Sequence, residues 1–304
     1  MSGVIQQRMP GHRHDLGGGF SVSRVLPGSP RRAIGPFVFI DYFGPTTLPP
    51  DRPMDVRPHP HIGLSTLTYL WQGRIRHRDG LGSDVRIEPG AVNWMTAGRG
   101  IVHSERTAPE DRGSPLPIHG LQLWLALPLD QEEAEPAFSH TAADVLPVFA
   151  VNNVKVTLVT GSAWDRQSPV PALGEPLLAD LRLPAGSRLA LPDTVEQRAL
   201  FVVDGEATAN GESLKPGELA IFTPGETIHI DAGSDCHAVL FGGPPLDAPR
   251  YLWWNFVSSS EARIQQACDD WQAQRYAMVE GDDEFIPLPA EDLAARPPVL
   301  LKPE

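Results

Sequence analysis

The sequence predicts an all-β fold made of two β-barrels in tandem with a few short helices, one of them near the C-terminus. Three observations lead to this prediction. Short apolar runs recur along most of the chain, Gly and Pro are abundant between them, and one block of sequence occurs twice. Strand-length runs separated by turn residues are typical of sandwiches and barrels, and an internal repeat indicates two copies of one unit.

The apolar runs lie between about Phe20 and Val257 and are rich in β-branched and aromatic residues. Examples are residues 37–40 (FVFI), 67–71 (LTYLW), 121–125 (LQLWL) and 154–159 (VKVTLV). Each run has the length of a strand rather than of a helix. The 28 Gly and 32 Pro residues are dispersed between these runs, so tight turns explain them better than disorder does.

A helix is predicted after the last of these runs. Ser258 stands three residues before Glu261, which is the spacing of a capping box. Ile264, Cys268 and Trp271 then recur at helical intervals. We expect this helix to pack on the outside of the sheets.

The repeat relates residues 89–98 (PGAVNWMTAG) to residues 216–225 (PGELAIFTPG). Upstream, the alignment continues with Gly73 on Gly205. An acidic, Ala-rich stretch bracketed by Pro separates the two copies. We therefore expect an N-terminal domain over residues 1–140 and a C-terminal domain over residues 141–304, the second carrying the helix.

Two triplets carry the chemistry: His59-Pro60-His61 and His103-Ser104-Glu105. Residues i and i+2 of a strand project from the same face, and neighbouring strands lie about 4.8 Å apart, so two adjacent strands can bring four ligands to one point. Three imidazoles and one carboxylate suit a divalent first-row metal and leave positions open for a substrate. One such triplet alone is more typical of a surface or turn, but two favour a metal site made by His59, His61, His103 and Glu105.

The second copy serves as an internal comparison. The alignment places Leu191 and Asp193 where the first copy has His59 and His61. With one residue of slip, His229-Ile230-Asp231 falls on the second triplet, so the second copy keeps a His-x-carboxylate pair and lacks the His-x-His pair. We therefore expect metal in the N-terminal domain, residues 1–140, and none in the C-terminal domain. We expect ordinary hydrogen-bonding or surface roles for the remaining single histidines, which include His77, His119, His140 and His237.

Composition excludes several classes of protein. The chain has 25 Lys and Arg against 38 Asp and Glu, a net charge of −13, which argues against nucleic acid or a membrane surface as the main partner. We expect a cytoplasmic protein, because the chain has no apolar stretch of about 18 residues and no signal-peptide core. Cys236 and Cys268 have neither zinc-type nor redox-type spacing, and no phosphate-loop Lys follows the turn at residues 17–19.

Residues 57–63 (RPHPHIG) and 95–105 (MTAGRGIVHSE) closely resemble the pirin family of the cupin superfamily. Residues 36–44, 120–124 and 283–289 add to the resemblance. It implies two cupin-type barrels with one mononuclear iron in the first, held by His59, His61, His103 and Glu105. The chain departs from the family pattern at Ile62 and Ser65, where relatives often carry Arg and Glu, which affects the expected pocket mouth rather than the ligands.

The resemblance also implies an activity, flavonol 2,3-dioxygenase (quercetinase), which opens the flavonol ring with O2. The substrate would be a small, flavonol-like aromatic. Glu105 is the hypothetical catalytic base, since it is the carboxylate of the set. The resemblance favours Fe²⁺, whereas residue types alone do not separate iron from nickel, copper, manganese or zinc.

Two alternatives stay open at this point. The chain could be a non-enzymatic module in which the metal regulates binding to a protein partner, a role associated with eukaryotic relatives. A different cupin reaction, such as sugar-phosphate isomerisation, would need cationic groups beside the metal, and Arg57 and Arg99 flank the two triplets.

Overall fold

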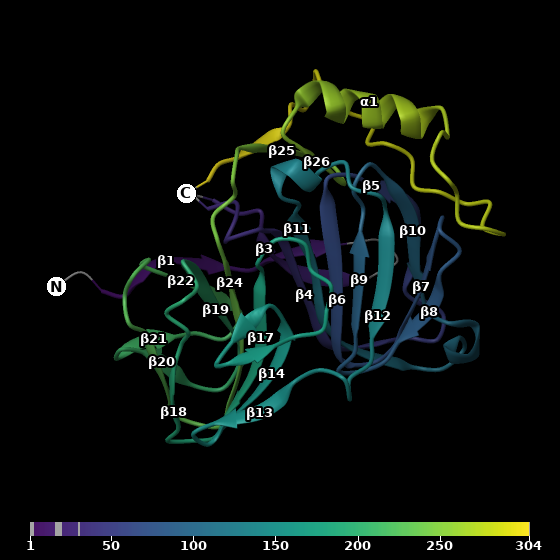
Figure 1. Cartoon of the computed structure of the whole chain (residues 1–304). Helices are drawn as coiled ribbons and strands as arrows, with labels where there is room; N and C mark the ends of the chain where they lie inside the picture. The colour runs from purple at the N-terminus through teal and green to yellow at the C-terminus, as the bar shows by residue number, and fades with distance from the viewer. Residues whose placement is uncertain (1–2, 16–19, 30, 304) are drawn as a thin grey trace.

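The computed structural model describes residues 3–15, 20–29 and 31–303 and places two β-barrels side by side (Figure 1). The predicted fold class is confirmed, because strands dominate these residues and α1 (Glu261–Gln272) lies near the C-terminus. The short helices η1 (Pro109–Asp111) and η2 (Leu129–Gln131) are single 3-10 turns. None of the helices in these ranges is long and apolar enough to cross a bilayer. The predicted turn at residues 17–19 lies outside the described residues.

The first barrel joins a seven-stranded and a four-stranded sheet, counted over the described ranges. The larger sheet consists, in spatial order, of β12 (Ala137–Thr141), β9 (Val92–Thr96), β6 (Leu64–Gln72), β11 (Leu116–Ala126), β4 (Phe37–Leu48), β3 (Ser21–Leu26) and β2 (His12–Asp15). The smaller sheet consists of β5 (Asp55–His61), β10 (Ile101–Arg106), β7 (Ile75–Asp79) and β8 (Asp84–Ile87).

The second barrel is likewise built from a seven-stranded and a four-stranded sheet, counted over the described residues. The larger consists of β1 (Ile5–Pro10), β22 (Glu218–Phe222), β19 (Gln197–Asp204), β24 (Cys236–Gly243), β17 (Leu177–Leu183), β14 (Val154–Thr160) and β13 (Val148–Val151). The smaller consists of β18 (Arg188–Ala190), β23 (His229–Ala232), β20 (Ala207–Ala209) and β21 (Glu212–Leu214). Short additional sheets are formed by β15 (Ser162–Ala163) with β16 (Arg166–Gln167), and by β26 (Phe256–Ser258), β25 (Arg250–Trp253) and β27 (Val299–Leu301).

The predicted repeat is visible strand by strand. The segment at residues 89–98 contains β9, which pairs with β6, and the segment at residues 216–225 contains β22, which pairs with β19. Gly73 and Gly205 make the same turn after β6 and β19, with φ of 88° and 83°. The two copies therefore share one topology.

The edge strands do not follow the order of the chain. β1, at the N-terminus, pairs with β22 and completes the large sheet of the second barrel. The equivalent position in the first barrel is taken by β12, which pairs with β9. The predicted division between residues 140 and 141 falls inside β12 and stays a prediction.

One apolar cluster lies between the two barrels, and the interiors of the two barrels differ. The large sheets pack against each other through one apolar cluster that includes Phe37, Tyr69, Phe201 and Phe241. The second barrel is filled by a single cluster of mainly aliphatic side chains. In the first barrel the apolar residues form two separate clusters, one around Phe39 and Trp124 and one around Phe43 and Ile118.

Strand β6 shows how the first barrel acquires its polar layer. Successive side chains of a strand alternate between faces, so Leu64, Thr66, Thr68 and Leu70 point the same way. All four are buried, with exposures of 4% or less. Two hydroxyl groups thus lie between two leucines on the inner face of the barrel, and that of Thr68 donates to Glu105 of β10 at 3.2 Å.

Helix α1 covers one end of the first barrel, against β25 and β26 (Figure 1). The face predicted to be buried is buried, as Ile264, Cys268 and Trp271 are at most 4% exposed. The predicted capping box at Ser258 is wrong. Ser258 pairs with Tyr251 as the last residue of β26, and this strand pairing keeps it extended and outside the helix.

The N-cap is instead Ser260, whose side chain makes no capping hydrogen bond. Its backbone N–H donates to the Ser258 hydroxyl at 3.2 Å. The predicted serine thus contributes to the turn before the helix. Cys236 and Cys268 are both buried and free.

The turn between β5 and β6 depends on Gly63. Its φ of +67° lies in the left-handed region, and a Cβ there would overlap the carbonyl oxygen of Val257. The Gly63 N–H donates to Gly98 O at 2.8 Å, and Val257 N–H donates to Ile62 O at 3.1 Å. The close approach holds β26 against the end of the strand that carries His61.

We therefore expect Gly63→Ala to lower the stability of the fold more than Gly82→Ala does. Gly82 also has a positive φ, of 88°, but a Cβ there meets no atom within 4 Å. Both substitutions carry the backbone cost of about 1 to 2 kcal/mol for a left-handed alanine, and overlap adds about 1 to 3 kcal/mol at Gly63. Urea denaturation of both variants measures the difference, and equal losses of stability would contradict the role of this contact.

Candidate metal centre

The predicted ligand strands are neighbours. β5 and β10 pair antiparallel, with His59 opposite His103 and His61 opposite Ile101. Because i and i+2 share a face, both histidines of β5 point toward the same side as His103. The three histidines are 7%, 1% and 1% exposed in the order His59, His61, His103. The two segments thus meet inside the first barrel.

The ligand atoms of these three histidines lie within 4.8 Å of one another. Each ring is held through Nδ1: His59 Nδ1 bonds Arg57 O at 2.8 Å, and His61 Nδ1 bonds Asn255 O at 3.1 Å. His103 Nδ1 faces the Nδ1 of His77 at 3.4 Å. These contacts leave Nε2 of each ring available, and the Nε2 of His103 is buried without a hydrogen-bond partner. A buried, unpartnered nitrogen beside two more is the donor set that a metal ion fits.

Electrostatics keep the three imidazoles in the ligating form. Burial lowers the pKa of His59 to about 4, although the hydrogen bond to Arg57 O opposes this change. Burial, followed by the neighbouring His59, lowers the pKa values of His61 and His103 well below their ordinary value. Only neutral imidazole binds a metal, so the site favours the required state near neutral pH.

Glu105 lies on β10, the strand that carries His103, and faces a cavity beside the histidines. It is not part of the three-histidine cluster. Its Oε1 accepts a hydrogen bond from the Thr68 hydroxyl at 3.2 Å. The pairing of β10 with β5 shifts between His103 and Glu105, so the carboxylate is displaced relative to the imidazoles. Burial raises the pKa of Glu105, while His77 and bonds from Thr68 and Gln122 lower it. The fourth ligand of the predicted set stays a prediction.

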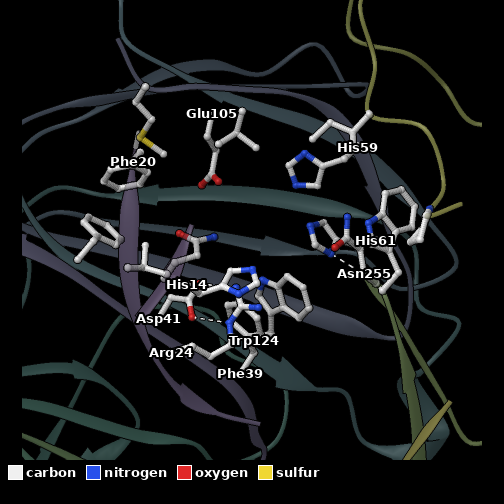
Figure 2. Close-up of a pocket in the computed structure, with 18 of the residues that line it drawn as sticks. His14, Phe20, Arg24, Phe39, Asp41, His59, His61, Glu105, Trp124 and Asn255 are labelled. Atoms are coloured by element: carbon white, nitrogen blue, oxygen red, sulfur yellow. Dashed lines mark hydrogen bonds and ion pairs between the residues drawn. The ribbon is translucent and has the colours of Figure 1, made fainter. Parts of the chain in front are cut away.

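Beside the histidines is a cavity of about 370 Å³. Figure 2 shows His59, His61 and Glu105 on its upper and right-hand walls and Phe39 and Trp124 below. Trp124 stacks on Phe39 with 4.0 Å between ring centroids and meets the ring of His61 edge-on at 5.0 Å. The cavity thus offers flat apolar walls next to polar ligand groups.

One charged pair enters this cavity. Arg24 binds both carboxylate oxygens of Asp41 at 2.8 Å, and its guanidinium lies 4.4 Å from the centroid of the Phe39 ring. Burial raises the pKa of Asp41, although Arg24 lowers it. The Arg24 cation thus lies over the face of the stacked Phe39 ring while Asp41 holds it.

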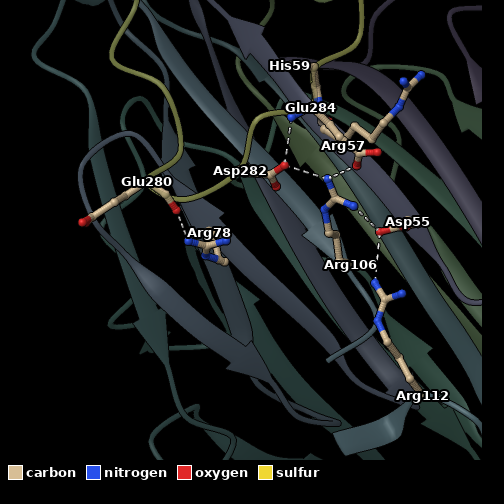
Figure 3. A network of polar contacts seen from close by, with 9 residues as sticks. All are labelled: Asp55, Arg57, His59, Arg78, Arg106, Arg112, Glu280, Asp282 and Glu284. Atoms are coloured by element: carbon tan, nitrogen blue, oxygen red, sulfur yellow. Dashed lines mark hydrogen bonds and ion pairs between the residues drawn. The ribbon is translucent and has the colours of Figure 1, made fainter. Parts of the chain in front are cut away.

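The C-terminal segment after α1 closes one side of the site. Arg106, next to Glu105, bonds Asp55, Asp282 and Glu284 at 2.7 to 2.9 Å (Figure 3). Further along, Ile286 N–H donates to Pro58 O at 2.8 Å, and Ile286 and Pro289 line the cavity. Part of the wall therefore comes from a segment far away in the sequence.

The second barrel carries aliphatic side chains where the first carries ligands. Leu191 is the counterpart of His59, as the alignment predicts, and it is 5% exposed. Its N–H donates to Ile228 O at 2.9 Å, which makes Ile228 the counterpart of His103. Ile230 lies opposite Ala209 as Glu105 lies opposite His77.

The His-x-carboxylate pair that the second copy keeps does not occupy the positions that correspond to His103 and Glu105. His229 and Asp231 lie one residue out of phase, so they face away from the barrel interior, and Asp231 pairs with Arg188 on the surface at 3.3 Å. A shift of one residue exchanges the two faces of a strand. The sequence resemblance there is local and does not preserve a ligand position.

Three of the single histidines make ordinary hydrogen bonds as predicted, namely His119 with Tyr42, His140 with Asn93 and His237 with Asp180. His77 also makes a hydrogen bond, to Asp79, but it differs from the other three because it contacts His103 as well. The sequence contains one signal for it: His77 and Asp79 are an i, i+2 pair on a strand of the same sheet.

Comparison with known proteins identifies the family. The family model described as Pirin matches residues 19–125, and the one described as Pirin C-terminal cupin domain matches residues 178–277. This chain belongs to the pirin family.

Relatives and a solved structure agree with this membership. A "Pirin-like protein" of Caulobacter vibrioides is 44% identical over 91% of this pirin and 96% of its own length. A Pseudomonas aeruginosa protein named "Putative quercetin 2,3-dioxygenase PA1205" is 38% identical over 92% of this chain and 86% of its own. The crystal structure titled quercetin 2,3-dioxygenase from Acinetobacter baumannii has a TM-score of 0.86 and 31% identity, covering 93% of this chain and 95% of that one.

Loss of a side chain that only hydrogen-bonds a metal ligand lowers metal affinity by roughly 10- to 100-fold. Because His59 is itself a predicted ligand, we expect His59→Ala to lower the affinity by more than that. His229→Ala is the matched control, because that residue aligns near His103 in sequence but faces outward. Elemental analysis and titration calorimetry with Ni²⁺ measure the effect. Retention of metal by the His59 variant, or an equal loss in both variants, would contradict the assignment of the site to the first barrel.

Proposed function

We propose that this pirin is a metal-dependent dioxygenase of the quercetin 2,3-dioxygenase type, with one divalent ion held by His59, His61 and His103 and approached by Glu105. One observation carries the proposal: three buried imidazoles lie together, and two of them, His59 and His61, line an aromatic-walled cavity that the buried carboxylate of Glu105 also faces. Relatives named for this activity support it. The family resemblance favours Fe²⁺ as the ion.

The cavity suits a flat aromatic substrate. Phe39, Trp124, Trp253 and Trp254 line it and offer ring faces and edges for stacking. Its volume of about 370 Å³ lies within the range of about 300 to 1,000 Å³ typical of small-molecule sites. A flavonol in this cavity would place its 3-hydroxyl toward the histidines and its rings against the aromatic wall.

A divalent ion at the three histidines would supply positive charge that stabilises the deprotonated flavonol for its reaction with O2. In this proposal Glu105 accepts the proton of the 3-hydroxyl. Its raised pKa makes it a stronger base than an exposed carboxylate, and the Thr68 hydroxyl orients it. The neutral imidazoles leave the charge of the ion largely uncompensated. Both oxygen atoms enter the ring-opened product, and one ring carbon leaves as carbon monoxide.

Two observations weigh against sugar-phosphate isomerisation. Arg99 pairs with Glu135 at the surface, where the two side chains are 59% and 75% exposed. Arg57 is exposed, and neither arginine is among the described residues that line the cavity. The two arginines that flank the triplets in sequence therefore do not enter the cavity. Arg24 and Arg296 do line it, and Arg24 is held by two hydrogen bonds to Asp41 rather than left free for a phosphate.

The activity is tested with the whole protein loaded with Fe²⁺ and incubated with quercetin under air. We expect the flavonol absorbance band to decay, with carbon monoxide released, only when both oxygen and metal are present. The metal-free protein and an anaerobic sample are the controls. Absence of decay across several flavonols would contradict the proposal and favour the alternative of a protein-binding module regulated by its metal.

The role of Glu105 is tested by Glu105→Gln. We expect kcat to fall by about 100-fold or more, the usual contribution of a general base, while metal content falls much less. The amide keeps the size of the side chain and can still accept a hydrogen bond from Thr68. Parallel measurement of turnover and bound metal decides the question, and equal losses of both would make Glu105 a ligand and not a base.

A further inference from the structure

Behind His103 lies a buried chain of two more side chains, His77 and Asp79 on β7. His77 Nδ1 is 3.4 Å from His103 Nδ1, and His77 Nε2 is 2.9 Å from Asp79 Oδ2. The side chains of His77 and Asp79 are 4% and 0% exposed. The polar chain thus runs from the candidate metal site to a carboxylate enclosed by protein.

The carboxylate of Asp79 is held in one orientation. Its Oδ1 accepts backbone N–H groups from Leu81 and Ser83 at 2.9 and 3.0 Å, which leaves Oδ2 for His77. An ionised carboxylate only accepts hydrogen bonds. The proton between Asp79 and His77 therefore belongs to Nε2 of His77.

The tautomer of His77 decides that of His103. In a neutral imidazole, a proton on Nε2 makes Nδ1 an acceptor. His77 Nδ1 can then pair with His103 only if His103 Nδ1 carries a proton and donates. That arrangement leaves a lone pair on His103 Nε2, the buried atom without a partner that faces the other two ligands.

The other two ligands obtain the same tautomer in a simpler way. His59 Nδ1 donates to Arg57 O, and His61 Nδ1 donates to Asn255 O. A backbone carbonyl can only accept, so it fixes the proton on Nδ1 by itself. His103 faces an imidazole instead, which could donate or accept, and Asp79 removes this ambiguity.

The geometry of His77 is restrained from a third direction. The ring of Phe138 on β12 stacks on it with 4.2 Å between centroids and 12° between planes. The ring of His77 is thus fixed in plane by Phe138 and in rotation by Asp79.

We propose that Asp79 and His77 are positioning residues that set the tautomer of His103, so that its Nε2 stays unprotonated and directed into the metal site. This inference rests on the metal site of the proposed function and is independent of the substrate. It assigns a role to two residues outside the predicted ligand set.

The substitution Asp79→Asn tests the proposal with little change in shape. The backbone N–H groups of Leu81 and Ser83 require an acceptor, so the amide oxygen takes the place of Oδ1 and the NH2 group takes the place of Oδ2. The amide then donates to His77 Nε2, which moves the proton of His77 to Nδ1. His103 must accept it, and its own proton moves to Nε2, where it opposes the metal.

Imidazole ¹⁵N chemical shifts of the metal-free protein report the tautomer directly. We expect His103 protonated on Nδ1 in the wild type and on Nε2 in Asp79→Asn, with affinity for Ni²⁺ about 10- to 100-fold lower in the variant. Asp84→Asn is the control, since Asp84 is an exposed residue of the neighbouring strand that pairs with Arg76. It should leave tautomer and affinity unchanged.

A second variant distinguishes an effect of Asp79 on the position of the proton from an effect on side-chain packing. The amide of Gln in His77→Gln can rotate, so its oxygen can accept from His103 Nδ1 whichever residue is at position 79. We expect Asp79→Asn to cost little affinity when it is added to His77→Gln. An equal cost in both backgrounds would mean that Asp79 acts through packing and would overturn the proposal.

The outcomes also distinguish this inference from the proposed function. A wild-type His103 protonated on Nε2, or an Asp79→Asn variant with unchanged tautomer and affinity, overturns the inference even if His59→Ala abolishes metal binding. Metal binding that survives His59→Ala overturns the proposed site, whatever the tautomer of His103.

Discussion

Three imidazoles buried side by side must remain neutral and must direct the same ring nitrogen to one point, and most of the first barrel is arranged around this constraint. Burial lowers the pKa of each, which keeps it neutral near pH 7. A partner on each Nδ1 then orients the ring. Two of these partners are backbone carbonyls. The carbonyl that binds His61 belongs to Asn255, in the turn between β25 and β26. The site is therefore assembled by the tertiary fold and not by its two strands alone.

The interiors of the two barrels differ. The second is filled with aliphatic side chains, including Leu191, Ile228 and Ile230 at the positions that correspond to ligands. The first holds a cavity and a polar layer, which lowers the apolar burial available to it. The apolar cluster between the large sheets joins the two, so the hollow barrel packs on a filled one. The pairing of β1 with β22 adds a further link between the N-terminal segment and the second barrel.

The sequence predicts much of this architecture, because strand length, turn residues and the repeat are local signals. It also predicts the three histidines, since two i, i+2 pairs need only a neighbouring strand to meet. It does not predict the phase of His229, because a single slipped residue before β23 reverses which face is buried. The sequence misplaces the helix cap because strand pairing holds Ser258 in β26. The sequence does not distinguish His77 from the other single histidines, because its contact with His103 depends on the register of β7 against β10.

X-ray absorption spectroscopy of the protein as purified, combined with elemental analysis, tests the central claim most directly. The account predicts one first-row metal ion per chain with three imidazole nitrogens in its coordination shell. A chain that takes up no ion after reconstitution with several metals, or whose ion has fewer than three imidazole ligands, would contradict it.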